Sequence, residues 1–455
     1  MSHLLSPRAG SPAQPRRSRW YGTVWRWHFY AGLFCIPFVV WLALTGSLYL
    51  WRPQVEALLD QPYDRLTTSA PAATAGAQLA AAIAAVPGAT LRSYVLPDAP
   101  GQAVRVLLTA PDGDRRVYLD PHAPAVLGVV REDQRPFNVL MRLHGELLAG
   151  TPGSVLVELA ACWAIVMLLT GLYLWWPRGQ LGAAGLLYPR LRRGPRLFWR
   201  DLHAVAGLWV SVLALALIVT GLPWAAAWGR YLGEVRTLTG TTQGPVDWTI
   251  GGRRPLAAAM PEHAGHGQRA STAAFAATDL ARVVATAPTL HLASPVLIAP
   301  PARAGVPWTV SSDTADRPLR AQAQVDGATG RVVGRLDFAD RHWIDRIIGY
   351  GIAAHEGALF GLVNQIVGTL TALLLIVLAI SGAVLWWRRR PAGLVHAPWP
   401  PRGPRFGVGL VATIVLLGLA MPLFGATLLM VLAADRLIVR RRPGLRRWLG
   451  LPVAA

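Results

Sequence analysis

The sequence has no lysine, two cysteines and few charges: Asp, Glu, Lys and Arg make up 15% of its 455 residues. A soluble globular chain carries about 25% charged residues, so the composition excludes an ordinary soluble enzyme. Cys35 and Cys162 both lie in apolar stretches, which excludes a disulfide framework. Because 53% of the residues are hydrophobic, a disordered chain is excluded too, and a polytopic membrane protein is predicted.

Long apolar runs recur along the chain, and Trp or Tyr residues stand near their ends, as is typical of residues at a membrane surface. Each run supplies the roughly 20 residues that a membrane-spanning helix needs. The runs predict membrane helices at 24–51, 144–176 (with a periplasmic helix before it), 202–228 and 355–387. Pro422 and Gly425 interrupt a fifth stretch, 406–434, which is either one kinked helix or a hairpin of two short helices.

Arginine is concentrated between these runs. Residues 1–27, 177–201, 388–405 and 435–455 hold 22 arginines and two acidic residues, and so carry the whole net charge of +20. Basic loops of membrane proteins face the cytoplasm, so cytoplasmic segments are expected at 1–23, 177–201, 388–405 and 435–455, and periplasmic ones at 52–143 and 229–354. Basic patches that bind nucleic acid are the other interpretation. The charge follows the ends of the apolar runs, so we expect no nucleic acid partner and a multi-pass protein of the bacterial inner membrane.

The start of the chain lacks the short apolar region and the cleavage site of a secretory signal. The first membrane helix is therefore expected to be retained, with the N-terminus in the cytoplasm.

The two halves of the chain repeat the same landmarks. His28 and His203 are each followed by Gly at +4 and by Thr-Gly at +17 and +18. His144 and His355 are each followed by Gly at +6 and +27 and by Trp-Trp at +31 and +32. Such spacing is typical of repeated folds. The predicted fold class is a polytopic α-helical membrane protein whose four core helices form a parallel internal duplication, followed by a C-terminal apolar hairpin or kinked helix.

Each half also holds a polar segment between its membrane helices. Residues 117–119 lead through a turn at Asp120 to 126–128, and residues 324–325 lead through a turn at Asp326 to 332–334. Both patterns predict a strand, an Asp-led turn and a second strand. An Ala-rich stretch around 78–85 predicts a helix upstream of the first pattern. Each polar segment is therefore expected to form its own small α+β domain.

Four of these motifs resemble one family: His28 with TGSLYLW, the RLH that ends at His144 with TGLYLWWPR, the DLH that ends at His203, and VDGATGRVVG before His355. On these motifs, about residues 20–390 resemble the PepSY-associated transmembrane helix family, which includes iron-regulated inner-membrane proteins and ferric-siderophore reductases. The resemblance implies PepSY-like domains at 52–143 and 229–354 and a ferric siderophore as the electron acceptor. The first domain departs from the pattern, because Ala123-Pro124 replaces the Thr-Gly of the turn.

Four histidines stand at matching places near the ends of the membrane helices, His28 and His203 on the cytoplasmic side and His144 and His355 on the periplasmic side. Polar residues that enter a membrane are costly and often functional. A symmetric pair of neutral imidazoles can supply both axial ligands of haem iron, so two haem b groups are expected. Glycines one and five turns after the first two histidines would let a flat ring or another helix approach. The alternative is that the histidines cap helices or bind lipid at the membrane surface.

Acidic residues accompany the histidines. Glu146 and Glu356 are expected to orient the imidazoles, to bind a ferric substrate, or to be solvated carboxylates. Glu158, inside a membrane helix, is expected to have a proton-transfer or a structural role. The sequence has no Rossmann fingerprint and no spacing that suits a catalytic triad, so the unknown electron donor is another protein or a quinol.

Together these expectations describe a membrane ferric-siderophore reductase that contains haem and moves electrons outward across the lipid bilayer. Two alternatives remain open. A permease for iron-siderophores, built from parallel repeats, predicts broken helices and polar residues at the midplane of the membrane. A PepSY membrane sensor or scaffold without enzymatic activity predicts no pigment.

Overall fold

The computed structural model describes residues 19–66, 71–177, 183–242, 276–303, 305–390, 395, 407–449 and 451. The expected N-terminal segment 1–23 and the basic loop 388–405 lie largely outside these residues, as do 178–182 of the loop at 177–201, 243–275 of the second polar segment, and 450 and 452–455 of the tail. The chain divides into two compact units. One comprises residues 1–35, 163–208 and 381–455, and the other residues 36–162 and 209–380.

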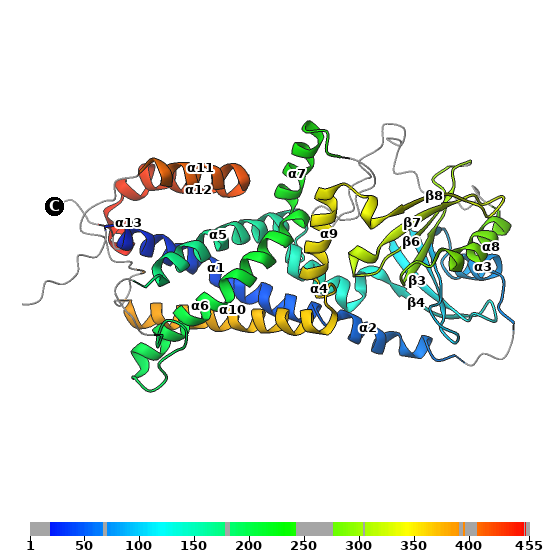
Figure 1. Cartoon of the computed structure of the whole chain (residues 1–455), viewed down its shortest axis with the longest axis horizontal. Helices are drawn as coiled ribbons and strands as arrows, with labels where there is room; N and C mark the ends of the chain where they lie inside the picture. Colours follow the sequence, from blue (N-terminus) through cyan, green and yellow to red (C-terminus); the bar gives the residue numbers. More distant parts are fainter. Residues whose placement is uncertain are drawn as a thin grey trace, which may run out of the picture. The chain divides into compact units, whose positions relative to one another are not determined.

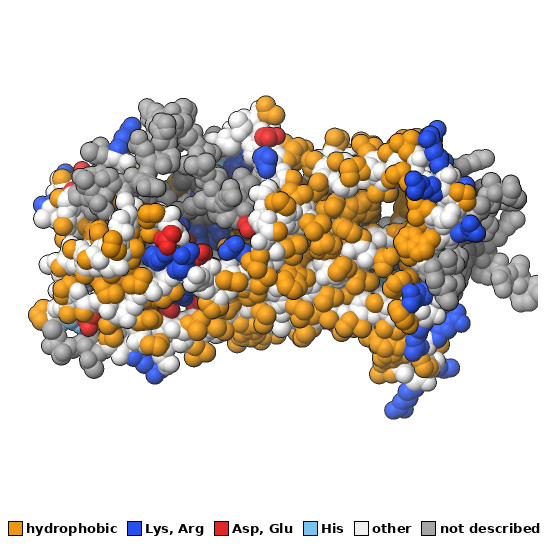
Figure 2. Space-filling model, turned by 180° about the vertical axis from the view of Figure 1, so that it is seen from behind, with side chains coloured by type: hydrophobic (Ala, Val, Ile, Leu, Met, Phe, Trp, Pro, Cys, Tyr) orange, Lys and Arg blue, Asp and Glu red, His pale blue; other side chains and the backbone are white. Residues whose placement is uncertain are grey.

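Four long apolar helices dominate the fold: α1 (Arg19–Tyr49), α5 (Thr151–Trp175), α6 (Pro195–Gly221) and α10 (Gly361–Arg389) (Figure 1). These helices and the segment Pro422–Arg441 are long and apolar enough to cross a membrane. Figure 2 shows hydrophobic side chains over the visible surface of the long helices and Arg side chains gathered near helix ends. The prediction of a polytopic helical membrane protein is therefore confirmed.

Shorter helices adjoin the long ones: α2 (Arg52–Asp60), α4 (Pro136–Glu146), α7 (Ala226–Leu238) and α9 (Trp343–His355). The expectation that one helix runs on from His355 is wrong, because α9 ends there and α10 begins only at Gly361. Gly357 and Gly361 have φ angles of 77° and 55°, in the left-handed region where a helix cannot continue. A matching corner separates α4 from α5.

All described strands form one antiparallel sheet of eight strands in the order β4-β3-β2-β1-β5-β6-β7-β8. The N-terminal half supplies β1 (Thr90–Val95), β2 (Val104–Ala110), β3 (Gly113–Leu119) and β4 (Val126–Arg131). The C-terminal half supplies β5 (Val296–Ala299), β6 (Trp308–Ser312), β7 (Ala321–Val325) and β8 (Val332–Asp337). The expectation of two separate α+β domains is therefore wrong. The halves join where β1 pairs with β5, Tyr94 opposite Ile298 and Val95 opposite Leu297, so neither strand is left as an exposed edge.

Two helices complete the core of this sheet: α3 (Ala75–Ala85) and α8 (Ala277–Thr286). Leu79 of α3 and Leu280 of α8 are buried in one hydrophobic cluster with residues from six of the strands. Both predicted turns are present: the Asp120 carboxylate accepts a hydrogen bond from the His122 backbone N–H, and Asp326 accepts one from that of Thr329. The Ala-rich helix and the strand–turn–strand patterns are confirmed.

The C-terminal apolar stretch is a helical hairpin of α11 (Val408–Ala420) and α12 (Pro422–Leu437), followed by α13 (Pro443–Trp448). A Cβ atom on Gly425 would lie 3.2 Å from the Cα atom of Gly418. Seven residues of one continuous helix rise about 10 Å, so this close approach requires the chain to fold back. Pro422 cannot continue α11 because it lacks the N–H that a helix interior uses. Of the two alternatives, the hairpin is the one observed.

Candidate functional site

The structure brings the four predicted histidines together as two pairs, each inside one unit. The first pair consists of His28 on α1 and His203 on α6, whose ring centroids are 6.2 Å apart at an interplanar angle of 76°. The second pair consists of His144 on α4 and His355 on α9, at 6.4 Å and 74°. The two pairs therefore have nearly the same geometry, although they lie on different kinds of helix.

Backbone carbonyl groups determine which ring nitrogen carries the proton in two of the histidines. The Nδ1 atom of His28 is 2.9 Å from the carbonyl oxygen of Met167, and that of His355 is 2.9 Å from the carbonyl oxygen of Leu217. A carbonyl can only accept a hydrogen bond, so Nδ1 is protonated and donates. The Nε2 atom of a neutral imidazole then keeps a free lone pair, which is the form that binds a metal.

Hydroxyl groups hold the other two imidazoles. The Nδ1 atom of His144 is 2.9 Å from Oγ1 of Thr45, which donates its own proton to the carbonyl oxygen of Trp41 at 2.8 Å. The hydroxyl therefore accepts from His144, whose Nε2 is left unprotonated as well. His203 Nδ1 lies 3.2 Å from Oγ of Ser381. Hydroxyls of Thr170 and Thr220 lie beside His28 and His355 in the same way.

A glycine beside each hydroxyl makes room for the imidazole. Added Cβ atoms would lie only 3.0–3.2 Å from an imidazole Cε1 at four glycines: Gly171 facing His28, Gly382 facing His203, Gly46 facing His144 and Gly221 facing His355. Each of the four Thr-Gly or Ser-Gly dipeptides thus contacts a histidine of another helix: the hydroxyl lies beside Nδ1, and the glycine leaves space for the ring. We call this contact the seat of the histidine. The sequence repeat revealed these dipeptides, but their role as hydrogen-bond partners of the histidines was not predicted.

The spacing of each pair fits the axial ligation of a haem iron. Two metal–nitrogen bonds of about 2 Å, together with about 1.2 Å from each nitrogen to its ring centroid, would put the centroids about 6.4 Å apart. The observed separations are 6.2 and 6.4 Å. Within the described ranges, no group of three or more His, Cys, Asp or Glu residues could hold a metal ion. Each pair therefore offers two ligands, which suits a metal whose other ligands come from a macrocycle.

Burial keeps the second pair neutral. It lowers the pKa of His144 to about 4, with a smaller contribution from the neighbouring His355. Burial also lowers the pKa of His355 to about 4, against the opposing effect of its hydrogen bond to Leu217. Both imidazoles are therefore uncharged at neutral pH, as iron ligation requires.

The two glutamates that follow this pair do not orient it. Among the described residues, the imidazole Nδ1 atoms bond to hydroxyl and carbonyl groups rather than to Glu146 or Glu356. Burial raises the pKa of Glu356, while the guanidinium groups of Arg317, Arg320 and Arg52 oppose that rise. Contact of either carboxylate with a substrate stays a prediction.

Two further side chains lie near the start of α7. Glu158 is buried and accepts a hydrogen bond from the backbone N–H of Ala227 at 2.8 Å. Its carboxylate therefore satisfies the N-terminus of α7, which favours the structural role over proton transfer. Trp224 packs edge-on against His355, with ring centroids 5.5 Å apart.

Together the fold and the paired histidines define a class: a polytopic helical membrane protein in which the segments that connect the long helices form an antiparallel sheet and in which four half-buried imidazoles form two pairs. The family model described as the PepSY-associated TM region matches residues 25–389. The chain belongs to this family, as its motifs indicated. A comparison with curated proteins finds no match.

Proposed function

We propose that this chain is a reductase of the bacterial inner membrane that contains two haem b groups and passes electrons to a periplasmic ferric siderophore. The donor is a quinol or a cytoplasmic protein. The observation that carries the proposal is the pair geometry: the two rings of each pair are 6.2 or 6.4 Å apart, a spacing at which both could bind one metal ion. The ferric siderophore as acceptor comes from the family resemblance.

The residues would divide the work as follows. His28 and His203 would hold one haem and His144 and His355 the other, and each haem would supply one-electron transfer when bound. Hydroxyl and carbonyl groups keep Nδ1 protonated, so that the lone pair of Nε2 would be free to bind the metal. One electron converts ferric iron to ferrous iron, which the hard oxygen ligands of a siderophore hold less tightly. The iron would then be released.

The topology forms part of the proposal. The arginine-rich segments would face the cytoplasm, and the eight-stranded sheet would lie in the periplasm. The same order of helices and strands in the two halves supports a parallel internal duplication. Cysteine-accessibility labelling of residues in the sheet, in intact cells and in inverted vesicles, tests this orientation.

The test of the function begins with a reduced-minus-oxidised absorbance spectrum and a pyridine haemochrome assay of the detergent-purified chain. We expect two b-type haems per chain in the wild type and one in each of the double variants His28→Ala/His203→Ala and His144→Ala/His355→Ala. His122→Ala, which alters a histidine outside both pairs, is the control. A colourless protein from cells supplied with hemin would contradict the proposal and favour the sensor or the permease.

The acceptor needs a separate measurement. The reduced protein is mixed with a ferric hydroxamate siderophore under anaerobic conditions, and reoxidation of the haem is followed with a ferrous chelator present. We expect one ferrous ion trapped for each electron lost. If the protein holds two haems but does not reduce the chelate, the histidines remain the proposed ligands, and the proposal that a ferric siderophore is the acceptor is contradicted.

A further inference from the structure

Both helices that carry the second histidine pair are short, and each has its histidine at its C-terminal end. Helix α4 has 11 residues and ends at Glu146, two residues after His144, and α9 has 13 residues and ends at His355 itself. Isolated helices of this length are marginal in water. The position of each imidazole therefore depends on what anchors the other end of its helix.

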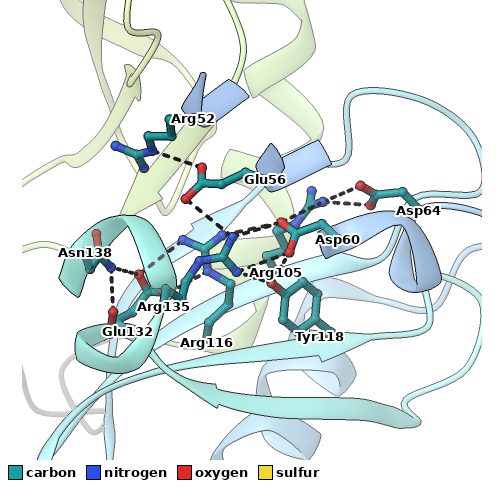
Figure 3. A network of polar contacts seen from close by, with 10 residues as sticks. All are labelled: Arg52, Glu56, Asp60, Asp64, Arg105, Arg116, Tyr118, Glu132, Arg135 and Asn138. Carbon is teal, nitrogen blue, oxygen red and sulfur yellow. Dashed lines mark hydrogen bonds and ion pairs between the residues drawn. The ribbon is translucent and has the colours of Figure 1, made fainter. Parts of the chain in front are cut away.

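A buried ion pair anchors the start of α4 (Figure 3). Arg135, directly before α4, is 5% exposed, and its Nη1 atom lies 3.2 Å from Oδ1 of Asp60 and 2.6 Å from the hydroxyl oxygen of Tyr118. Asp60 is the last residue of α2 and also accepts a hydrogen bond from Tyr118 at 2.9 Å. This cluster fixes α4 against α2 and strand β3.

A second buried ion pair anchors the start of α9. Asp345, the third residue of α9, accepts two hydrogen bonds from Arg236 of α7, at 2.6 and 2.7 Å. Arg236 is 2% exposed and Asp345 is 7% exposed. Such a bidentate pair fixes direction as well as distance. Helix α7 thus holds α9 as α2 holds α4.

The two ion pairs occupy corresponding places with their charges exchanged. Helix α2 follows α1, and α7 follows α6, while α4 precedes α5 and α9 precedes α10. Of the two anchoring helices, α2 carries the acidic residue, Asp60, and α7 carries the basic residue, Arg236.

We infer that Asp60 with Arg135, and Arg236 with Asp345, are positioning residues for the second histidine pair. Removing one charge of a pair takes away the closest opposite charge of the other, which is buried. The inference rests on the proposed function only where haem serves as the readout.

The experiment compares three variants of the full-length chain. Asp345→Asn is expected to weaken haem binding at the second pair by roughly tenfold or more and to shift the midpoint potential of any haem left there. The first pair keeps its haem, which shows that the protein is folded. The exchange Arg236→Asp/Asp345→Arg restores an ion pair with the polarity of Asp60 and Arg135, and is expected to recover at least half of the lost haem. Asp435→Asn, in an ion pair with Arg440 whose side chains are both more than a third exposed, is the control and is expected to change nothing.

A second haem with unchanged occupancy and potential in Asp345→Asn would overturn the inference, and so would an exchange variant no better than the single one. Hydrogen–deuterium exchange separates this failure from failure of the proposed function. Even in a wild type without haem, Asp345→Asn is expected to speed exchange of the α9 amides by roughly tenfold, and Asp435→Asn is not. Equal exchange rates in α9 of the wild type and Asp345→Asn would overturn the inference whatever the haem content.

Discussion

The two histidine pairs reach the same geometry by different means. His28 and His203 lie within helices of 31 and 27 residues, where the neighbouring helices hold the rings. His144 and His355 lie at the ends of helices of 11 and 13 residues. Ring separations of 6.2 and 6.4 Å therefore show that two imidazoles can be brought to the same spacing by long packed helices or by short helices that end at corners.

The second pair also depends on the sheet. Strand β4 leads through the turn Glu132–Gln134 into α4, and β8 leads through Phe338–Asp340 into α9. These are the two outermost strands of the sheet, so each ligand helix continues directly from one of its edges. The end of a short helix opens more easily than the packed interior of a long one. We therefore expect the second pair to be the more sensitive to local changes.

The largest effect is expected at the corner between α4 and α5. An Ala side chain at Gly153 would put its Cβ 1.7 Å from the carbonyl oxygen of Glu146, so Gly153→Ala must open the corner and displace His144. We expect the absorbance spectrum to show loss of the haem at the second pair and an intact one at the first. Gly145→Ala is the matched control, because its Cβ meets nothing within 4 Å and Ala stabilises a helix by up to about 1 kcal/mol over Gly. A wild-type spectrum for Gly153→Ala would show that the corner does not set this pair.

The first pair has its own sensitive point, at the seat of His28. A Cβ on Gly171 would lie 3.0 Å from Cε1 of this histidine, so Gly171→Ala pushes the ring away from its seat. Overpacking a well-packed site costs about 1–3 kcal/mol, and haem titration should show weaker binding at the first pair only. In Gly32→Ala the nearest atom, Sδ of Met167, is at an ordinary 3.7 Å, and we expect no change. Equal effects of the two variants would contradict the interpretation that Gly171 leaves the space in which the His28 ring lies.

A smaller effect is expected from the hydroxyl groups. Thr45→Val removes the hydroxyl that accepts from His144, whereas Thr220→Val leaves His355 its bond to the carbonyl of Leu217 at 2.9 Å. Groups that orient a ligand contribute roughly 10–100-fold to metal affinity, so Thr45→Val should weaken haem binding at the second pair more than Thr220→Val does. Titration with hemin of the two variants side by side measures the difference. A larger loss in Thr220→Val would reverse the assignment of partners.

The sequence alone identified the long helices, the strand–turn–strand patterns and the four histidines, because apolar run length and repeated spacing are local signals. It did not predict that the polar segments share one sheet, because the pairing of β1 with β5 joins residues about 200 positions apart. Nor did it reveal the ion pair of Arg236 and Asp345, since nothing nearby in the chain distinguishes these residues from solvated charges. Gly46 and Gly221, five helical turns after His28 and His203, were expected to leave space for a flat ring or another helix. Each of them instead lies against a single imidazole.

The smallest effect is expected at the glutamates beside the second pair. Neither carboxylate holds an imidazole among the described residues, so Glu146→Gln and Glu356→Gln should retain both haems with unchanged spectra. Glu356 differs from Glu146 in facing the guanidinium groups of Arg317, Arg320 and Arg52, so any change in the rate of ferric chelate reduction should be larger in Glu356→Gln. Spectra and stopped-flow reoxidation of both variants measure the two properties separately. Loss of the second haem in either variant would show that a carboxylate, and not only Thr45, Thr220 or the backbone, keeps these imidazoles in place.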